Sequence, residues 1–149
     1  MLNLLAVMLA VASFTVQVHG KGPAMILIPG LASSGEVGDG AVARYQDVFT
    51  LAGFAGQPPV DPPLLPAAME ELMSTDLRPS LRRLRAPLLL IAAGAGSRFA
   101  EKDLLARSES QVAAAPQKRV LVASKARHFV MLGDPGFLFA RMDEFLGGK

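Results

Sequence analysis

The sequence predicts an α/β fold, with a mostly parallel sheet, an antiparallel edge hairpin and flanking helices. Apolar runs short enough to be buried strands recur at residues 24–28, 87–93 and 119–123. Segments with apolar residues at helical spacing separate the last two runs and follow the final one. Strands that alternate with helices are typical of a right-handed, mostly parallel sheet.

The composition limits the class of protein. Of the 149 residues, 51% are hydrophobic and 19% are charged, which excludes a disordered chain and allows the core of one domain. The formal net charge of +2 is too small to argue for nucleic acid, so no such partner is expected. The arginines of residues 78–85 are interpreted as a solvated helix face. With no cysteine and two distant histidines, neither a metal nor another cofactor is expected.

Residues 1–13 are interpreted as an apolar N-terminal segment and residues 14–149 as a single domain. The apolar run is too short to span a bilayer as a helix, so no stable membrane span is expected. Ala10-Val11-Ala12 has the small-residue pattern of a signal-peptide cleavage site, although no Lys or Arg precedes Lys21. A signal peptide, which implies a secreted or periplasmic protein, is favoured over an unprocessed segment of a cytoplasmic protein.

The first half of the chain predicts two strands and a glycine-rich turn. Residues 14–18 alternate as in a half-buried edge strand, and residues 24–28 are apolar enough to be buried on both faces. The glycines between them favour an antiparallel hairpin. Residues 29–35, PGLASSG, follow directly, and Ser33 or Ser34 can cap a short helix after this turn. Backbone amides at such a turn can also face an oxyanion.

The middle of the chain is less regular. Residues 48–51 predict a short strand, and the proline-punctuated residues 53–66 are expected to be irregular. Residues 67–74 are expected to form a helix whose apolar stripe consists of Met69, Leu72 and Met73. A second short helix follows, with Leu81 and Leu84 facing inward and its arginines facing outward.

The second half predicts a strand, a helix, another strand and a closing helix. Residues 99–114 have the pattern of an amphipathic helix between the strands at 87–93 and 119–123. Asp134-Pro135 predicts the start of the closing helix, because aspartate is a good N-cap and proline suits the first helical position.

His128 follows the last predicted strand. It therefore lies near that strand's C-terminal end, which is the edge where open α/β sheets bind ligands. The alternative is a structural or solvent-exposed loop histidine.

Four stretches, taken in order, resemble bacterial α/β-hydrolase fold proteins of the esterase and lipase-like kind. They are IPGLASSG at 28–35, ELMSTDLRP at 71–79, APLLLIAAG at 86–94 and RHFVMLGDPGFLF at 127–139. The resemblance covers nearly all of residues 14–146 and implies a serine hydrolase with an oxyanion hole. It matches Gly30 and Leu31 to the oxyanion loop, with the Leu31 N–H as donor, and His128 to the general base.

The sequence departs from this family at the nucleophile. It contains no G-x-S-x-G, the motif that holds the catalytic serine on a strand-to-helix elbow. Roughly a hundred residues, including the elbow strand and the cap region, are missing relative to the ~200–250 residues that such domains need. The expected fold is therefore a truncated α/β-hydrolase-like domain.

Ser33 and Ser34 are the candidate nucleophiles, since their loop is expected to face His128 at the sheet edge. Helix capping is their competing role. Asp103 is the candidate acid of the triad, with Glu101 as the neighbouring carboxylate. Asp134 is an alternative partner for the histidine, although its N-cap position already accounts for it.

The expected function is hydrolysis of short acyl esters by a Ser–His–acid mechanism, with a small ester or acyl molecule as the substrate. The alternatives are a catalytically inactive relic and an acyl-chain binding module. Loss of the central strand would expose a sheet edge, so a homodimer could form by pairing across it.

Overall fold

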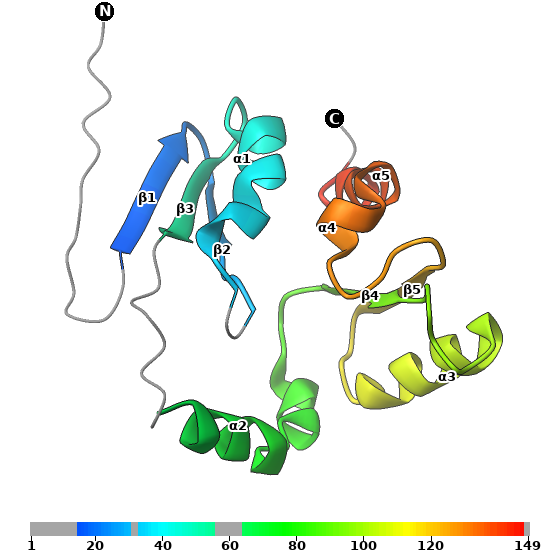
Figure 1. Cartoon of the computed structure of the whole chain (residues 1–149). Coiled ribbons are helices and arrows are strands. Elements are labelled where there is room, and N and C mark those ends of the chain that lie inside the picture. The colour runs from blue at the N-terminus through cyan, green and yellow to red at the C-terminus, as the bar shows by residue number, and fades with distance from the viewer. Residues whose placement is uncertain (1–14, 31–32, 56–63, 148–149) are drawn as a thin grey trace, which may run out of the picture. The chain divides into compact units, whose positions relative to one another are not determined.

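A computed structural model describes residues 15–30, 33–55 and 64–147 (Figure 1). The described residues fall into two compact units, divided between Met73 and Ser74. Helices and strands occur together in both units, so the chain is an α/β protein. The single domain over residues 14–149 stays a prediction. The apolar segment 1–13, with its signal-peptide pattern, lies outside the described residues.

The first unit is built on a three-stranded sheet with the strand order β1-β3-β2 (Figure 1). The strands are β1 (Thr15–Gly20), β2 (Ala24–Leu27) and β3 (Thr50–Ala55). β1 runs antiparallel to β3, and β2 runs parallel to β3. β1 is an edge strand, as predicted, but the predicted hairpin is wrong, because β3 lies between the two strands and pairs with both.

The turn between β1 and β2 explains this arrangement. Gly20 and Gly22 adopt φ values of 81° and 124°, which side chains rarely allow. A Cβ at Gly20 would overlap the carbonyl oxygens of Gln46 and Phe49, so the turn packs directly on the segment that leads into β3. The Thr50 amide and hydroxyl donate to the carbonyls of Pro23 and Gly22, both at 2.9 Å. These bonds place the start of β3 beside β2.

Burial in this sheet is one-sided. Leu51 is fully buried, whereas Ile26, whose row in the sheet faces the opposite way, is 66% exposed. The short helices η1 (Gly35–Gly38) and α1 (Asp39–Tyr45) lie beside one face, where Leu27 approaches Gly38 (Figure 1). The expectation that β2 is buried on both faces is therefore wrong, since β2 is an edge strand with one covered face.

The helix expected at residues 67–74 is present as α2 (Leu64–Ser74). It begins earlier than expected because Pro66 falls in its first turn, where a missing amide hydrogen costs no internal bond. The predicted stripe is exposed rather than packed, at Met69, Leu72 and Met73. The strand expected at 48–51 starts instead at Thr50, and it includes the first residues of the stretch expected to be irregular. Residues 56–63 of that stretch lie outside the described part of the chain.

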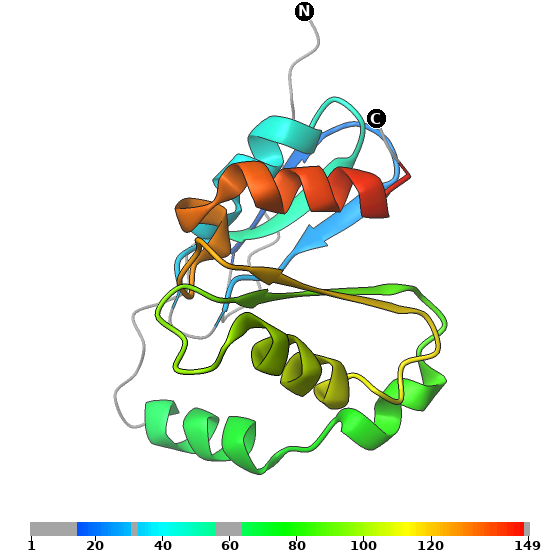
Figure 2. The same cartoon turned by 90° about the vertical axis from the view of Figure 1, so that its right-hand side faces the viewer.

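The second unit holds two parallel strands with a helix on each face (Figure 2). β4 (Leu88–Ala93) and β5 (Lys118–Ala123) are connected by α3 (Glu101–Gln111), and the closing helix α5 (Pro135–Phe145) lies on the opposite face. This confirms the strand–helix–strand–helix order predicted for the second half. The described strands pair in two small sheets, so a single hydrolase-like sheet stays a proposal.

Two short helices complete the second unit. In η2 (Arg78–Arg83) and the residue after it, Leu81 and Leu84 are half-buried while the arginines are exposed, as expected of a solvated basic face. The one-turn helix α4 (Val130–Gly133) has no counterpart in the predictions. None of the helices in the described ranges combines the length and apolar character that a membrane crossing requires.

Candidate functional site

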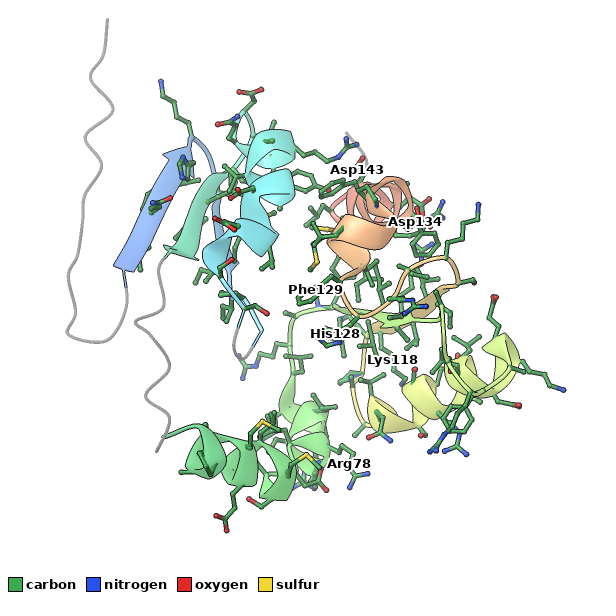
Figure 3. All side chains as sticks on the ribbon, viewed as in Figure 1. Arg78, Lys118, His128, Phe129, Asp134 and Asp143 are labelled. Atoms are coloured by element: carbon green, nitrogen blue, oxygen red, sulfur yellow. The ribbon has the colours of Figure 1, made fainter. Side chains whose placement is uncertain are left out.

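His128 lies in the connection between β5 and α4, at the C-terminal end of the parallel strands (Figure 3). Its position is the one predicted. The side chain is exposed, and its ring meets the Phe129 ring edge-on, with the centroids 5.0 Å apart. Within the described residues, no protein group is hydrogen-bonded to the imidazole. Its ring nitrogens are therefore available to solvent or to a ligand.

A small, tight core holds this connection in place. Ala123 and Ala126 are fully buried, and Val130 is nearly so. Half-buried apolar side chains from β4 and α5 pack against these three residues: Ile91, Ala93, Phe137 and Leu138. Because both ends of the connection are anchored in the core, His128 projects from a fixed loop.

The exit of β4 is bonded directly to this loop. The Gly94 amide donates to the Ala123 carbonyl at 3.0 Å, and the Ala95 amide donates to the Ala126 carbonyl at 2.9 Å. Gly94 leaves no room for a side chain, since a Cβ would lie 2.9 Å from Cγ1 of Val122 and 3.0 Å from Cα of Ser124. The close approach of the ends of β4 and β5 therefore requires a glycine at position 94.

Glu101, and not Asp103, is the carboxylate that reaches the end of β5. Its Oε2 accepts a hydrogen bond from the Ser124 hydroxyl at 2.7 Å. Asp103 is exposed, and no hydrogen bond or ion pair joins it to His128 in the described structure. Two residues along a helix turn a side chain through about 200°, so Glu101 and Asp103 point in nearly opposite directions. The structure therefore does not bring the predicted acid to the histidine.

Asp134 is used as a helix cap. Its Oδ1 accepts a hydrogen bond from the Phe137 amide at 3.2 Å, and Pro135 occupies the first helical position. The predicted helix start is confirmed in both respects. The carboxylate has no hydrogen bond to His128 among the described residues, so its capping bond is its observed role.

The glycine-rich loop after β2 belongs to the first unit, whereas His128 and Asp103 belong to the second. The Ser33 amide donates to the Gly30 carbonyl at 3.0 Å. Ser34 occupies the N-cap position of η1 but makes no side-chain cap bond, and its hydroxyl donates to Glu36 Oε2 at a long 3.4 Å. Leu31, the expected oxyanion donor, lies outside the described residues.

Ser124 was not among the residues predicted from the sequence to belong to the site. A polar residue directly after a buried strand was the available signal, because the carboxyl ends of parallel strands meet at one edge. Ser97, at the exit of β4, accepts a bond from the Phe99 amide at 3.1 Å and so stabilises its own turn. Over the described ranges, no three acidic or histidine side chains are grouped closely enough to hold a metal ion.

Comparison with protein-family models and with curated proteins gave no match to this chain. Two features of the site indicate what chemistry it can carry out. These are an exposed imidazole on a fixed loop and a serine–carboxylate pair at the end of the same strand.

Proposed function

We propose that the chain is a hydrolase of small carboxylic esters, of the α/β-hydrolase kind, with His128 as its general base. The observation that carries the proposal is the exposed imidazole on a firmly packed loop at the C-terminal end of β5. Histidine can accept a proton near neutral pH and is the side chain used most often as a general base. Packing fixes this loop without engaging the ring nitrogens, which leaves them for a reacting hydroxyl.

In the proposed reaction, a serine hydroxyl attacks the ester carbonyl while His128 removes its proton. The N–H of Leu31 stabilises the oxyanion of the tetrahedral intermediate, and His128 then donates the proton to the leaving alcohol. Water attacks the resulting acyl-serine with the same assistance. This step releases the carboxylic acid and restores the serine.

Ser33 and Ser34 are the proposed nucleophiles. Ser34 is the better candidate of the two, because its side chain is exposed and its hydrogen bond to Glu36 is long. The proposal requires that one of these hydroxyls come within roughly 2.6–3.2 Å of an imidazole nitrogen during the reaction.

Of the three proposed catalytic residues, the acid has the least support from the structure. Asp103 remains the proposed acid from the sequence, while the bond to Ser124 favours Glu101 as the carboxylate at this edge. Separate Asp103→Asn and Glu101→Gln variants distinguish them, since only loss of the orienting carboxylate lowers kcat.

Turnover of p-nitrophenyl acetate and butyrate by the full chain tests the function. We expect His128→Ala and one of Ser33→Ala or Ser34→Ala to lower kcat by about 100-fold or more, the usual contribution of acid–base catalysis. Lys125→Ala, an exposed change in the same loop, is the matched control and should keep the full rate.

A fluorophosphonate probe reports serine activation independently of turnover. We expect it to label Ser33 or Ser34, with the modified residue identified by peptide mass, and to fail with His128→Ala. Full rates in the His128 and both serine variants, or labelling that does not depend on His128, would show that the assigned residues are wrong.

The alternatives are a catalytically inactive relic and an acyl-chain binding module. They stay open because Asp103 is exposed and no described hydrogen bond or ion pair joins it to His128. Retention of a fatty acid without esterase turnover or probe labelling would support the binding module. Size-exclusion chromatography at several concentrations would also test for a homodimer, because β2 is an edge strand that could pair between copies.

A further inference from the structure

Two arginines of the second unit converge on one aromatic ring. Cζ of Arg98 lies 5.0 Å from the centre of the Phe99 ring, and Cζ of Arg107 lies 4.1 Å from it. Both are cation–π contacts, in which the positive guanidinium is attracted to the electron-rich ring. The two guanidinium carbons are at most about 9 Å apart, since their separation cannot exceed the sum of their distances to the ring centre.

We call Arg98, Phe99 and Arg107 the arginine cluster. Arg98 and Phe99 lie in the connection from β4 to α3, and Arg107 lies within α3. Phe99 is half-buried, whereas both arginines are exposed. Because the ring restricts both guanidinium groups and leaves them open to solvent, less conformational entropy is lost when their N–H groups bind a ligand.

No carboxylate neutralises this cluster within the described residues. Neither Arg98 nor Arg107 has a hydrogen bond or an ion pair there. Asp103 lies one helical turn before Arg107, but no described ion pair joins the two. Like charges held close together repel each other, so an anion that accepts hydrogen bonds from both arginines would be bound favourably.

Another pair of arginines in the same unit shows how one anion serves two guanidinium groups. Arg119 bonds to one carboxylate oxygen of Glu144 at 2.8 Å, and Arg141 bonds to the other at 2.6 Å. In the arginine cluster, no described side chain of the protein plays the part of Glu144. An anion from solution can therefore take that part.

We propose that the arginine cluster binds a phosphate dianion, either inorganic phosphate or the phosphate group of a small monoester. A phosphate group carries a charge of about −1.5 to −2 at neutral pH and offers three acceptor oxygens. Guanidinium groups bind such oxygens in pairs, at about 2.7–2.9 Å. A carboxylate offers two oxygens and a single charge, so it compensates the two arginines less completely. This inference is independent of the proposed ester hydrolysis.

Isothermal titration of the full chain with inorganic phosphate, phenyl phosphate and acetate tests the proposal. At neutral pH and low salt, we expect both phosphate compounds to bind at least about tenfold more tightly than acetate. Tighter binding of phenyl phosphate than of inorganic phosphate would assign a monoester as the ligand. Equal or weaker binding of phenyl phosphate would assign the free ion.

Substitutions locate the site. Arg98→Ala and Arg107→Ala should each weaken phosphate binding by about tenfold or more, because each removes charge-assisted hydrogen bonds. The lysine variants at the same positions keep the charge but lose the planar fork, so they should weaken binding several-fold. Lys102→Ala is the matched control: it removes an exposed positive charge from the same helix, on a different side from Arg107. Circular dichroism checks that every variant is folded.

Three results would overturn the proposal. The first is unchanged phosphate binding in both alanine variants of the arginine cluster. The second is an equal loss of binding in Lys102→Ala, which would indicate attraction to the general positive charge of the surface. The third is binding of acetate as tight as that of phosphate, or no saturable binding of phosphate at millimolar concentrations.

Discussion

Gly94→Ala should destabilise the second unit, because the end of β4 approaches β5 too closely for a side chain. The new Cβ would lie 2.9 Å from Cγ1 of Val122 and 3.0 Å from Cα of Ser124, against 3.4–4 Å for ordinary contact. One neighbour is backbone and the other is a β-branched side chain with few rotamers, so neither can move away easily. The strand ends must therefore separate.

The expected cost follows from two opposing terms. Overpacking of this kind costs roughly 1–3 kcal/mol, while replacing glycine with alanine restricts the unfolded chain and returns about 0.4–1 kcal/mol. The net loss in the free energy of unfolding thus lies between about 0 and 2.6 kcal/mol, and the central values of the two terms give about 1.3 kcal/mol. Because the Gly94 amide bonds to the Ala123 carbonyl, the same shift should displace the loop that carries His128.

Urea denaturation followed by far-ultraviolet circular dichroism measures this effect. Gly136→Ala in α5 is the matched control, since a Cβ there meets nothing within 4 Å and the backbone has no positive φ. It should be neutral or stabilising, by up to about 1 kcal/mol. A Gly94→Ala variant as stable as Gly136→Ala would refute the argument from close approach.

Three further outcomes are expected. Leu51→Ala should cost about 2–5 kcal/mol in denaturation because Leu51 is fully buried, whereas Ile26→Ala at an exposed position should cost far less. Asp134→Ala should cost about 1 kcal/mol by removing the cap on the Phe137 amide, and Asp134→Asn should retain most of it. The side-chain bond from Arg78 lowers the pKa of Asp76 below its ordinary 3.8, and NMR titration of Arg78→Gln should show that pKa rising towards 3.8. Because the pKa of Asp76 is lowered, the pair stabilises the folded chain at pH values above the ordinary carboxyl pKa of 3.8. This stabilisation is lost as the pH falls through the lowered pKa. An unchanged Asp76 pKa in Arg78→Gln would contradict the pairing.

Local signals predicted the second unit well. The apolar run at 87–93 and the β-branched run at 119–123 became β4 and β5, and Asp134-Pro135 began α5 with the expected capping bond. Gly147, just after the last helix, adopts a φ of 99°, the left-handed conformation in which glycine commonly ends a helix. Each of these features depends on a few neighbouring residues, which is why spacing alone could reveal it.

The candidate site was predicted only in part. The order of the predicted elements placed His128 after β5, as observed. It did not predict that Glu101 would be the carboxylate at the C-terminal end of this strand. Asp103 and Glu101 are equally plausible in sequence, and they differ in which side of α3 they occupy. That choice depends on how α3 is rotated against the strands, and only packing decides the rotation.

The sequence by itself determined where most helices and strands form, because caps, turns and apolar periodicity act over a few residues. Only the tertiary structure decided that β3 pairs between β1 and β2, that β2 has one covered face, and that Glu101 bonds to Ser124. These features join residues distant in the chain. They depend on close approaches, such as Gly20 against the Gln46 carbonyl, that no local pattern encodes.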